Sequence, residues 1–158
     1  MVRNRLKRSG LAIAAAALGA TGSQARPTAR DFLVDEQIVR QADGATSHVR
    51  VYARERDRGD WISIVPSLGR GVEDYTEAYQ STLTTRLVDA GYRVILVQPR
   101  GIGKSSGNLD PATLSMDLLV DDLAHAFAEM GIAQVNLVGH AYGNRLSRIF
   151  ATRYPSRI

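Results

Sequence analysis

The chain has 158 residues, of which 44% are hydrophobic, and it contains no cysteine. This length and apolar content predict one domain with a buried core and exclude global disorder, and the lack of cysteine excludes disulfides and cysteine-ligated metal centres. The formal net charge of +4 equals the four basic residues that crowd the first ten positions, so the rest of the chain has no excess positive charge of the kind that indicates nucleic-acid binding.

Residues 1–25 have the pattern of an export signal. The basic start is followed by the apolar run Leu11–Ala20, which has about the length of a signal-peptide core and is too short to span a bilayer. Ser23-Gln24-Ala25 then provides a small-x-small cleavage site. We therefore expect a signal peptide over residues 1–25 and an exported protein, periplasmic or secreted, without a stable membrane span. The alternative is an uncleaved anchor or a plain alanine-rich tail.

The next segments predict a linker and then a hairpin. Residues 26–36 are polar and include Pro27, which is typical of a linker. Asp43-Gly44 lies between the β-prone runs Ile38–Gln41 and His48–Glu55, and Asp-Gly in this position is a strong hairpin signal. The second run alternates polar and apolar residues, so we expect one side of that strand, including His48, to face solvent.

From residue 61 onward, apolar runs and helical periodicities alternate. The order is strand, helix, strand, helix, strand, helix, which predicts a parallel sheet with right-handed crossovers. The expected elements are the strand Trp61–Val65, a helix marked by Tyr75, Tyr79, Leu83 and Leu87 and ended by Gly91, the strand Tyr92–Val97, the helix Met116–Met130 capped by Gly131, the strand Val135–Val138, and a helix marked by Leu146, Ile149, Phe150 and Tyr154 and ended by Pro155.

The turn between the last strand and the last helix is a Gly-x-Ala-x-Gly motif, Gly139–Gly143. Glycines at its two ends let the helix pack closely on the strand, and the central residue, Ala141, is forced into strained backbone geometry that costs about 1–3 kcal/mol. The helix N-terminus behind the turn attracts anions. Taken alone, this motif also fits an ordinary tight turn of a doubly wound fold.

Three segments in chain order together resemble the α/β-hydrolase superfamily across about residues 37–158, roughly the first half of such a domain. Val65–Gly69 stands where the family has an apolar strand ending in His-Gly-x-Gly. Gln98–Ser105 resembles the Asp-x-Arg-Gly-x-Gly-x-Ser loop, and Gly139–Gly143 resembles the nucleophile elbow Gly-x-Ser-x-Gly. The resemblance implies an α/β fold: a mostly parallel α/β-hydrolase-type sheet with flanking helices, truncated after the elbow helix.

The same resemblance assigns site residues and reveals departures. Ala141 holds the position of the nucleophile, and the backbone N–H groups of Leu68 and Tyr142 are the implied oxyanion hole. Pro66-Ser67 replaces His-Gly, and Gln98 replaces the acid of the loop. The family's triad acid and histidine follow later strands, beyond Ile158, so the resemblance implies a fragment of a larger protein.

Other chemistry is weakly supported. The loop ending at Lys104-Ser105 does not match a phosphate-binding P-loop, because Gln98 stands where that motif needs glycine. Ser67 as a substitute nucleophile lacks an evident His-acid pair.

His140 is interpreted as a packing residue directed away from the pocket. His125 and the acidic group Asp117, Asp121 and Asp122 are interpreted as surface residues. The histidines lack metal-ligand spacing, so we expect no metal and no cofactor.

The implied function is hydrolysis of an ester- or amide-type small molecule in the full-length family context. Serine-type catalysis is expected to be absent from this chain, because the methyl group of Ala141 has no lone pair. Three alternatives stay open: a non-catalytic ligand-binding protein, an engineered protein in which alanine replaces a serine at position 141, and a gene fragment. The expected partner is a small molecule rather than nucleic acid, and the sequence does not predict an oligomeric state.

Overall fold

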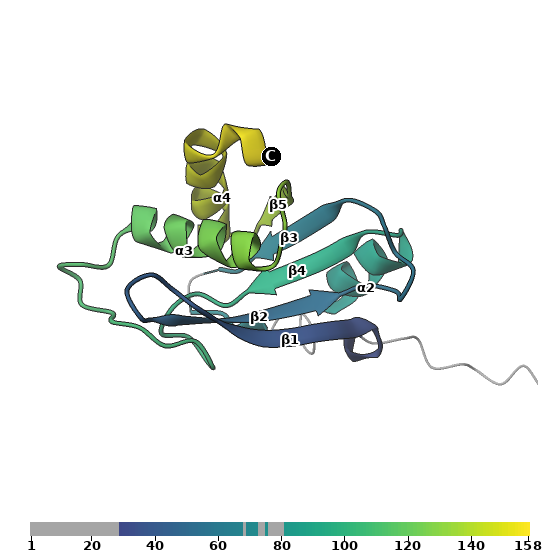
Figure 1. The fold of residues 1–158 in the computed structure, drawn as a ribbon, viewed down its shortest axis with the longest axis horizontal. Coiled ribbons are helices and arrows are strands. Elements are labelled where there is room, and N and C mark those ends of the chain that lie inside the picture. The colour runs from purple at the N-terminus through teal and green to yellow at the C-terminus, as the bar shows by residue number, and fades with distance from the viewer. Residues whose placement is uncertain (1–28, 68, 73–74, 76–80) are drawn as a thin grey trace, which may run out of the picture.

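The computed structural model describes residues 29–67, 69–72, 75 and 81–158 (Figure 1). The predicted signal peptide and Leu68 and Tyr79 lie outside the described residues. The elements are the 3-10 turn η1 (Ala29–Phe32), the strands β1 (Leu33–Arg40), β2 (Thr46–Tyr52) and β3 (Trp61–Val65), the helix α2 (Ser81–Asp89), the strand β4 (Arg93–Val97), the helix α3 (Met116–Glu129), the strand β5 (Asn136–Gly139), the helix α4 (Tyr142–Arg153) and the 3-10 turn η2 (Pro155–Arg157).

The described strands form one sheet in the order β1-β2-β4-β3-β5. The ladders β1–β2 and β2–β4 are antiparallel, whereas β4–β3 and β3–β5 are parallel. Helices α3 and α4 pack on one face of the sheet, and α2 packs on the other (Figure 1). This arrangement confirms the predicted α/β fold with flanking helices.

Two apolar clusters fill the two faces, because successive side chains of a strand point to opposite sides. Along β4, Ile95 and Val97 belong to the cluster under α3 and α4, and Val94 and Leu96 belong to the cluster under α2. All four are buried, so both faces of this strand are covered, which agrees with its continuous run of apolar residues.

The hairpin is confirmed, but its first strand begins earlier than predicted. β1 starts at Leu33, so residues 33–36 of the predicted linker belong to the sheet. Their side chains are mostly exposed, because β1 is an edge strand that is held by its backbone ladder to β2. At the turn, Gly44 has a φ of 85°, and Asp43 Oδ1 accepts a hydrogen bond from the Ala45 N–H at 3.0 Å.

The expectation that one side of β2 faces solvent is wrong. His48 and Arg50 are buried, as are the apolar residues between and beside them. The strand lies between β1 and β4. His48 finds its partners on β1 and just after β4: its Nε2 lies 2.6 Å from Glu36 Oε1, and its Nδ1 lies 2.9 Å from Gln98 Oε1. The alternating polar residues of this strand therefore belong to a buried hydrogen-bonded network and do not face solvent.

Candidate active site at the elbow

The turn between β5 and α4 has the geometry of an elbow. Ala141 has φ 49° and ψ −111°, and it is the only non-glycine residue with positive φ in the described part of the chain. This left-handed region is costly for a residue with a Cβ, so the surrounding packing must hold it. Ala141 is exposed at the start of α4. The structure thus places a methyl group at the apex of the turn.

Both glycines of the motif are required by close backbone approach. A Cβ on Gly143 would overlap the carbonyl oxygen of Val65 and lie 2.7 Å from that of Pro66. A Cβ on Gly139 would lie 2.5 Å from Cα of Asn144. The His140 N–H also donates to the Val65 carbonyl at 3.2 Å. These contacts press α4 against the end of β3 and fix the strained turn.

A polar link that the sequence did not reveal joins the elbow to the loop after β3. The hydroxyl of the buried Tyr75 accepts a hydrogen bond from the Ser67 N–H at 2.9 Å and lies 2.8 Å from His140 Nδ1. The rings of Tyr75 and His140 also meet edge to face, with centroids 5.9 Å apart. Because the Tyr75 oxygen already accepts from Ser67, its own proton is available for Nδ1. His140 is exposed and contacts this tyrosine. The two residues are far apart in sequence, so their contact is seen only in the structure.

Of the two backbone donors of the implied oxyanion hole, the structure describes one, Tyr142. Tyr142 is the first residue of α4, and the first N–H groups of a helix have no acceptor within the helix. The Tyr142 phenol donates to Met116 Sδ at 2.6 Å, which ties the elbow to the start of α3. Leu68 lies outside the described residues, so the oxyanion hole stays a prediction.

The loop after β4 is built around a neutral amide. Gln98 is fully buried, and its Oε1 accepts a hydrogen bond from the Lys104 N–H at 3.3 Å and contacts His48 Nδ1. Gly103, with φ 53°, passes so close that a Cβ there would lie 2.9 Å from Cδ of Gln98. Ser105 Oγ donates to the Gln98 carbonyl at 2.9 Å. Gln98 therefore organises the loop from within, at the position where the motif has an acid.

Arg100 in the same loop forms a buried ion-pair network. Its Nε and Nη2 each lie 2.7 Å from a carboxylate oxygen of Asp122, and its Nη1 lies 2.6 Å from Asp43 Oδ2. The hydrogen bond to Asp122 raises the pKa of Arg100, and the hydrogen bond from Arg100 lowers the pKa of Asp43. The interpretation of Asp122 as a surface residue is therefore wrong, whereas Asp117 is exposed and Asp121 is half-buried. Asp122 turns inward because Arg100 is buried beside it.

Glu36 on β1 gives the fold an acid-sensitive contact. Its Oε1 lies 2.8 Å from Lys104 Nζ, 2.6 Å from His48 Nε2 and 3.3 Å from Arg50 Nε. The hydrogen bonds from Lys104 and His48 lower the pKa of Glu36 from 4.5 to about 2. Since the folded pKa is below the unfolded one, the carboxylate stabilises the fold above pH 4.5, and this contribution is lost as the pH falls toward about 2.

We therefore expect Glu36→Gln to be less stable than the unmodified protein at neutral pH, with the difference shrinking below about pH 4.5. Urea unfolding measured at a series of pH values tests this expectation. Glu55→Gln is the control, because Glu55 is exposed and has no ion pair with another described residue. A constant difference between Glu36→Gln and the unmodified protein from pH 7 to pH 3 would contradict the assignment.

The described residues bring no metal-ligand set together: they contain no cluster of three or more acidic, histidine or cysteine side chains suited to a metal ion. Within the same residues, every helix is too short or too polar to cross a bilayer.

Comparisons with known proteins identify the family of this chain. The family profile of the alpha/beta hydrolase fold matches residues 60–158. The abhydrolase domain-containing protein lid-1 of Caenorhabditis elegans is 31% identical over 127 residues, which are 76% of this chain and 33% of that protein. A 2-hydroxy-6-oxononadienedioate/2-hydroxy-6-oxononatrienedioate hydrolase of Paraburkholderia phymatum is 30% identical over 123 residues, which are 77% of this chain and 41% of that protein.

Solved structures agree with the sequence matches. An alpha/beta hydrolase from Novosphingobium aromaticivorans superposes with a TM-score of 0.65 at 29% identity, over 78% of this chain and 41% of that one. Epoxide hydrolase VrEH1 from Vigna radiata has a TM-score of 0.68 over 81% of this chain and 38% of that one, and at 19% identity it is a likeness of fold alone. The chain spans less than half the length of each of these four proteins.

Proposed function

Because the chain belongs to the α/β-hydrolase fold family, we propose that it carries the elbow of a protein whose family chemistry is the hydrolysis of an ester- or amide-type bond in a small molecule. Relatives named as hydrolases of small molecules support a small-molecule substrate, and the ester- or amide-type bond rests on the family resemblance. With Ala141 at the apex, this chain is proposed to lack serine-type catalysis. Its export to the periplasm or outside the cell is a further proposal, which rests on the pattern of residues 1–25.

The observation that carries the proposal is the conformation of Ala141. Its φ of 49° and ψ of −111° hold the Cβ of a non-glycine residue on an exposed apex at a helix N-terminus. Such strain is useful where the side chain presents an oxygen for nucleophilic attack, and alanine supplies none. The scaffold for the nucleophile is therefore present without the reacting atom.

A second candidate is a binding protein that holds a carbonyl or anionic ligand at the elbow. Tyr142 favours it, because its backbone N–H opens the helix and does not depend on the side chain at position 141. Binding by backbone donors would survive the loss of the nucleophile. This candidate and the first differ in whether a serine at position 141 would restore bond cleavage at the elbow.

We expect Ala141→Ser, made in the full-length protein, to react at position 141 with a fluorophosphonate probe and to raise p-nitrophenyl ester turnover by about 10³-fold or more. The unmodified protein is expected to form no adduct in the elbow peptide. Ala141→Gly is the matched control, since it keeps the turn and adds no oxygen. Peptide mass spectrometry and initial rates are the measurements.

Serine-type turnover by the unmodified protein, with an adduct at another residue such as Ser67, would contradict the proposal. If Ala141→Ser stays unreactive while an alkyl phosphonate raises the Tm of both proteins, the binding candidate replaces the first. Measurements on the unmodified protein and its variants at position 141 therefore distinguish the two candidates.

A further inference from the structure

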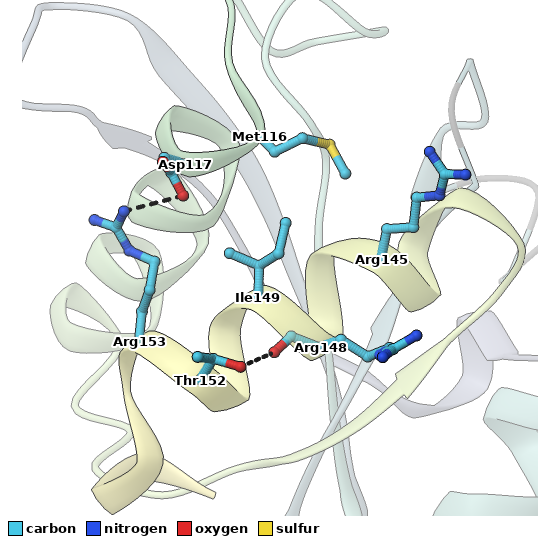
Figure 2. A pocket seen from close by; sticks show the side chains of 7 residues that line it. All are labelled: Met116, Asp117, Arg145, Arg148, Ile149, Thr152 and Arg153. Carbon is cyan, nitrogen blue, oxygen red and sulfur yellow. Dashed lines mark hydrogen bonds and ion pairs between the residues drawn. The ribbon is translucent and has the colours of Figure 1, made fainter.

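A groove lies between α3 and α4 on the outer side of these helices (Figure 2). Its volume is about 520 Å³, which is within the range of small-molecule sites. The floor is apolar and consists of the half-buried side chains of Met116 and Ile149. Figure 2 shows Ile149 pointing from α4 toward Met116 at the start of α3. The groove therefore offers an apolar strip to a ligand.

One end of the groove is closed by ion pairs. Arg153 Nη1 lies 3.0 Å from Asp117 Oδ1, and its Nη2 lies 2.8 Å from Asp121 Oδ1 (Figure 2 shows the first pair). The same Nη2 also lies 3.1 Å from the second oxygen of Asp121. The acids near this end are thus already paired with Arg153.

The other end carries two arginines whose guanidinium groups pair with no other described residue. Arg145 and Arg148 are exposed on α4, and neither has a side-chain hydrogen bond or ion pair within the described part of the chain. They are three residues apart, a spacing at which like charges on a helix repel each other. Arg145 also lies in the first turn of α4, where the helix dipole disfavours a cation. Both guanidinium groups lack a partner in the described part of the chain, so both are available to an anion in the groove.

We propose that this groove binds a soluble amphipathic anion, with its carboxylate or phosphate head on Arg145 and Arg148 and its apolar tail on Met116 and Ile149. Guanidinium groups match the geometry of carboxylate and phosphate oxygens and form charge-assisted hydrogen bonds with them. The apolar strip adds the burial of a short alkyl chain. This site adjoins the elbow, because Met116 of its floor accepts a hydrogen bond from the Tyr142 phenol, but it does not depend on the chemistry proposed at Ala141.

The test uses octyl phosphate as the probe and isothermal titration calorimetry of the full-length protein. The double variant Arg145→Gln/Arg148→Gln is expected to bind it at least about tenfold more weakly, because the hydrogen bonds to two charged groups are lost. Arg86→Gln is the matched control: Arg86 is an exposed arginine of α2, on the opposite face of the sheet, and its loss should leave the affinity unchanged. A Tm measured for each variant confirms folding.

Two half-ligands test the two parts of the site. Inorganic phosphate and octanol are each expected to bind at least about tenfold more weakly than octyl phosphate. Equal affinity for inorganic phosphate would overturn the amphipathic assignment, since the apolar floor would then contribute nothing. Unchanged affinity in the double variant, no binding of octyl phosphate, or binding only to phosphatidylglycerol vesicles would each overturn the proposal.

Discussion

Gly143→Ala is expected to lower the free energy of unfolding by about 3 kcal/mol or more, at the upper end of the cost of overpacking. The added Cβ would overlap the carbonyl oxygen of Val65, and backbone cannot move aside as a flexible side chain can. Either α4 must withdraw from β3 or the elbow must lose its conformation. Equilibrium unfolding in urea, monitored by circular dichroism, measures the loss.

Gly131→Ala is the matched control for this prediction. Gly131 has a φ of 68°, but a Cβ there would meet no atom within 4 Å. Its replacement should cost only the left-handed conformation, about 1–2 kcal/mol. If both variants lose the same stability, the clash with Val65 is not what makes glycine necessary at position 143.

Arg100→Met is expected to cost about 3–5 kcal/mol, because it leaves the buried carboxylate of Asp122 without its partner. The guanidinium is itself buried and makes two hydrogen bonds of 2.7 Å to that carboxylate, so solvent cannot replace them. The double variant Arg100→Met/Asp122→Leu is expected to recover much of the loss, since it removes the uncompensated charge as well. Urea unfolding of the three proteins measures both effects.

The exposed pair Arg54–Asp89 is the control for the buried network. Its side chains are 52% and 46% exposed, and its 2.5 Å contact is therefore screened by solvent. Arg54→Met is expected to change the unfolding free energy by no more than about 1 kcal/mol. A loss as small as this for Arg100→Met would mean that Asp122 reaches water or another donor in the native protein.

The sequence was sufficient for the elements whose signals are local. The helix α3 was correctly predicted from its apolar stripe and from Gly131, and the structure adds the cap at Ser115, whose Oγ accepts from the Leu118 N–H at 3.1 Å. The elbow was predicted because two glycines and an apolar strand are neighbours in sequence. In each case the residues that decide the structure lie within a few positions of one another.

The failures concern polar residues whose partners are distant in sequence. Asp122 and His48 have the spacing of surface residues, and only the packing of Arg100 and Gln98 against them reveals that they are buried. The start of β1 was missed for a similar reason, because an edge strand held by backbone hydrogen bonds needs no apolar pattern. Tyr75 carries no local signal of its contact with the elbow.

The hydrogen bond from His140 to Val65 has a consequence for how the protein folds. β5 pairs with β3 alone among the described strands, and the two segments are separated by the whole of α2, β4 and α3. Contacts that close so long a loop tend to form late, because closing the loop lowers the entropy of the chain and local structure must first offset part of this loss. The strained turn is therefore expected to be among the last features to assemble, and the first to be lost when β5 detaches from its single neighbour.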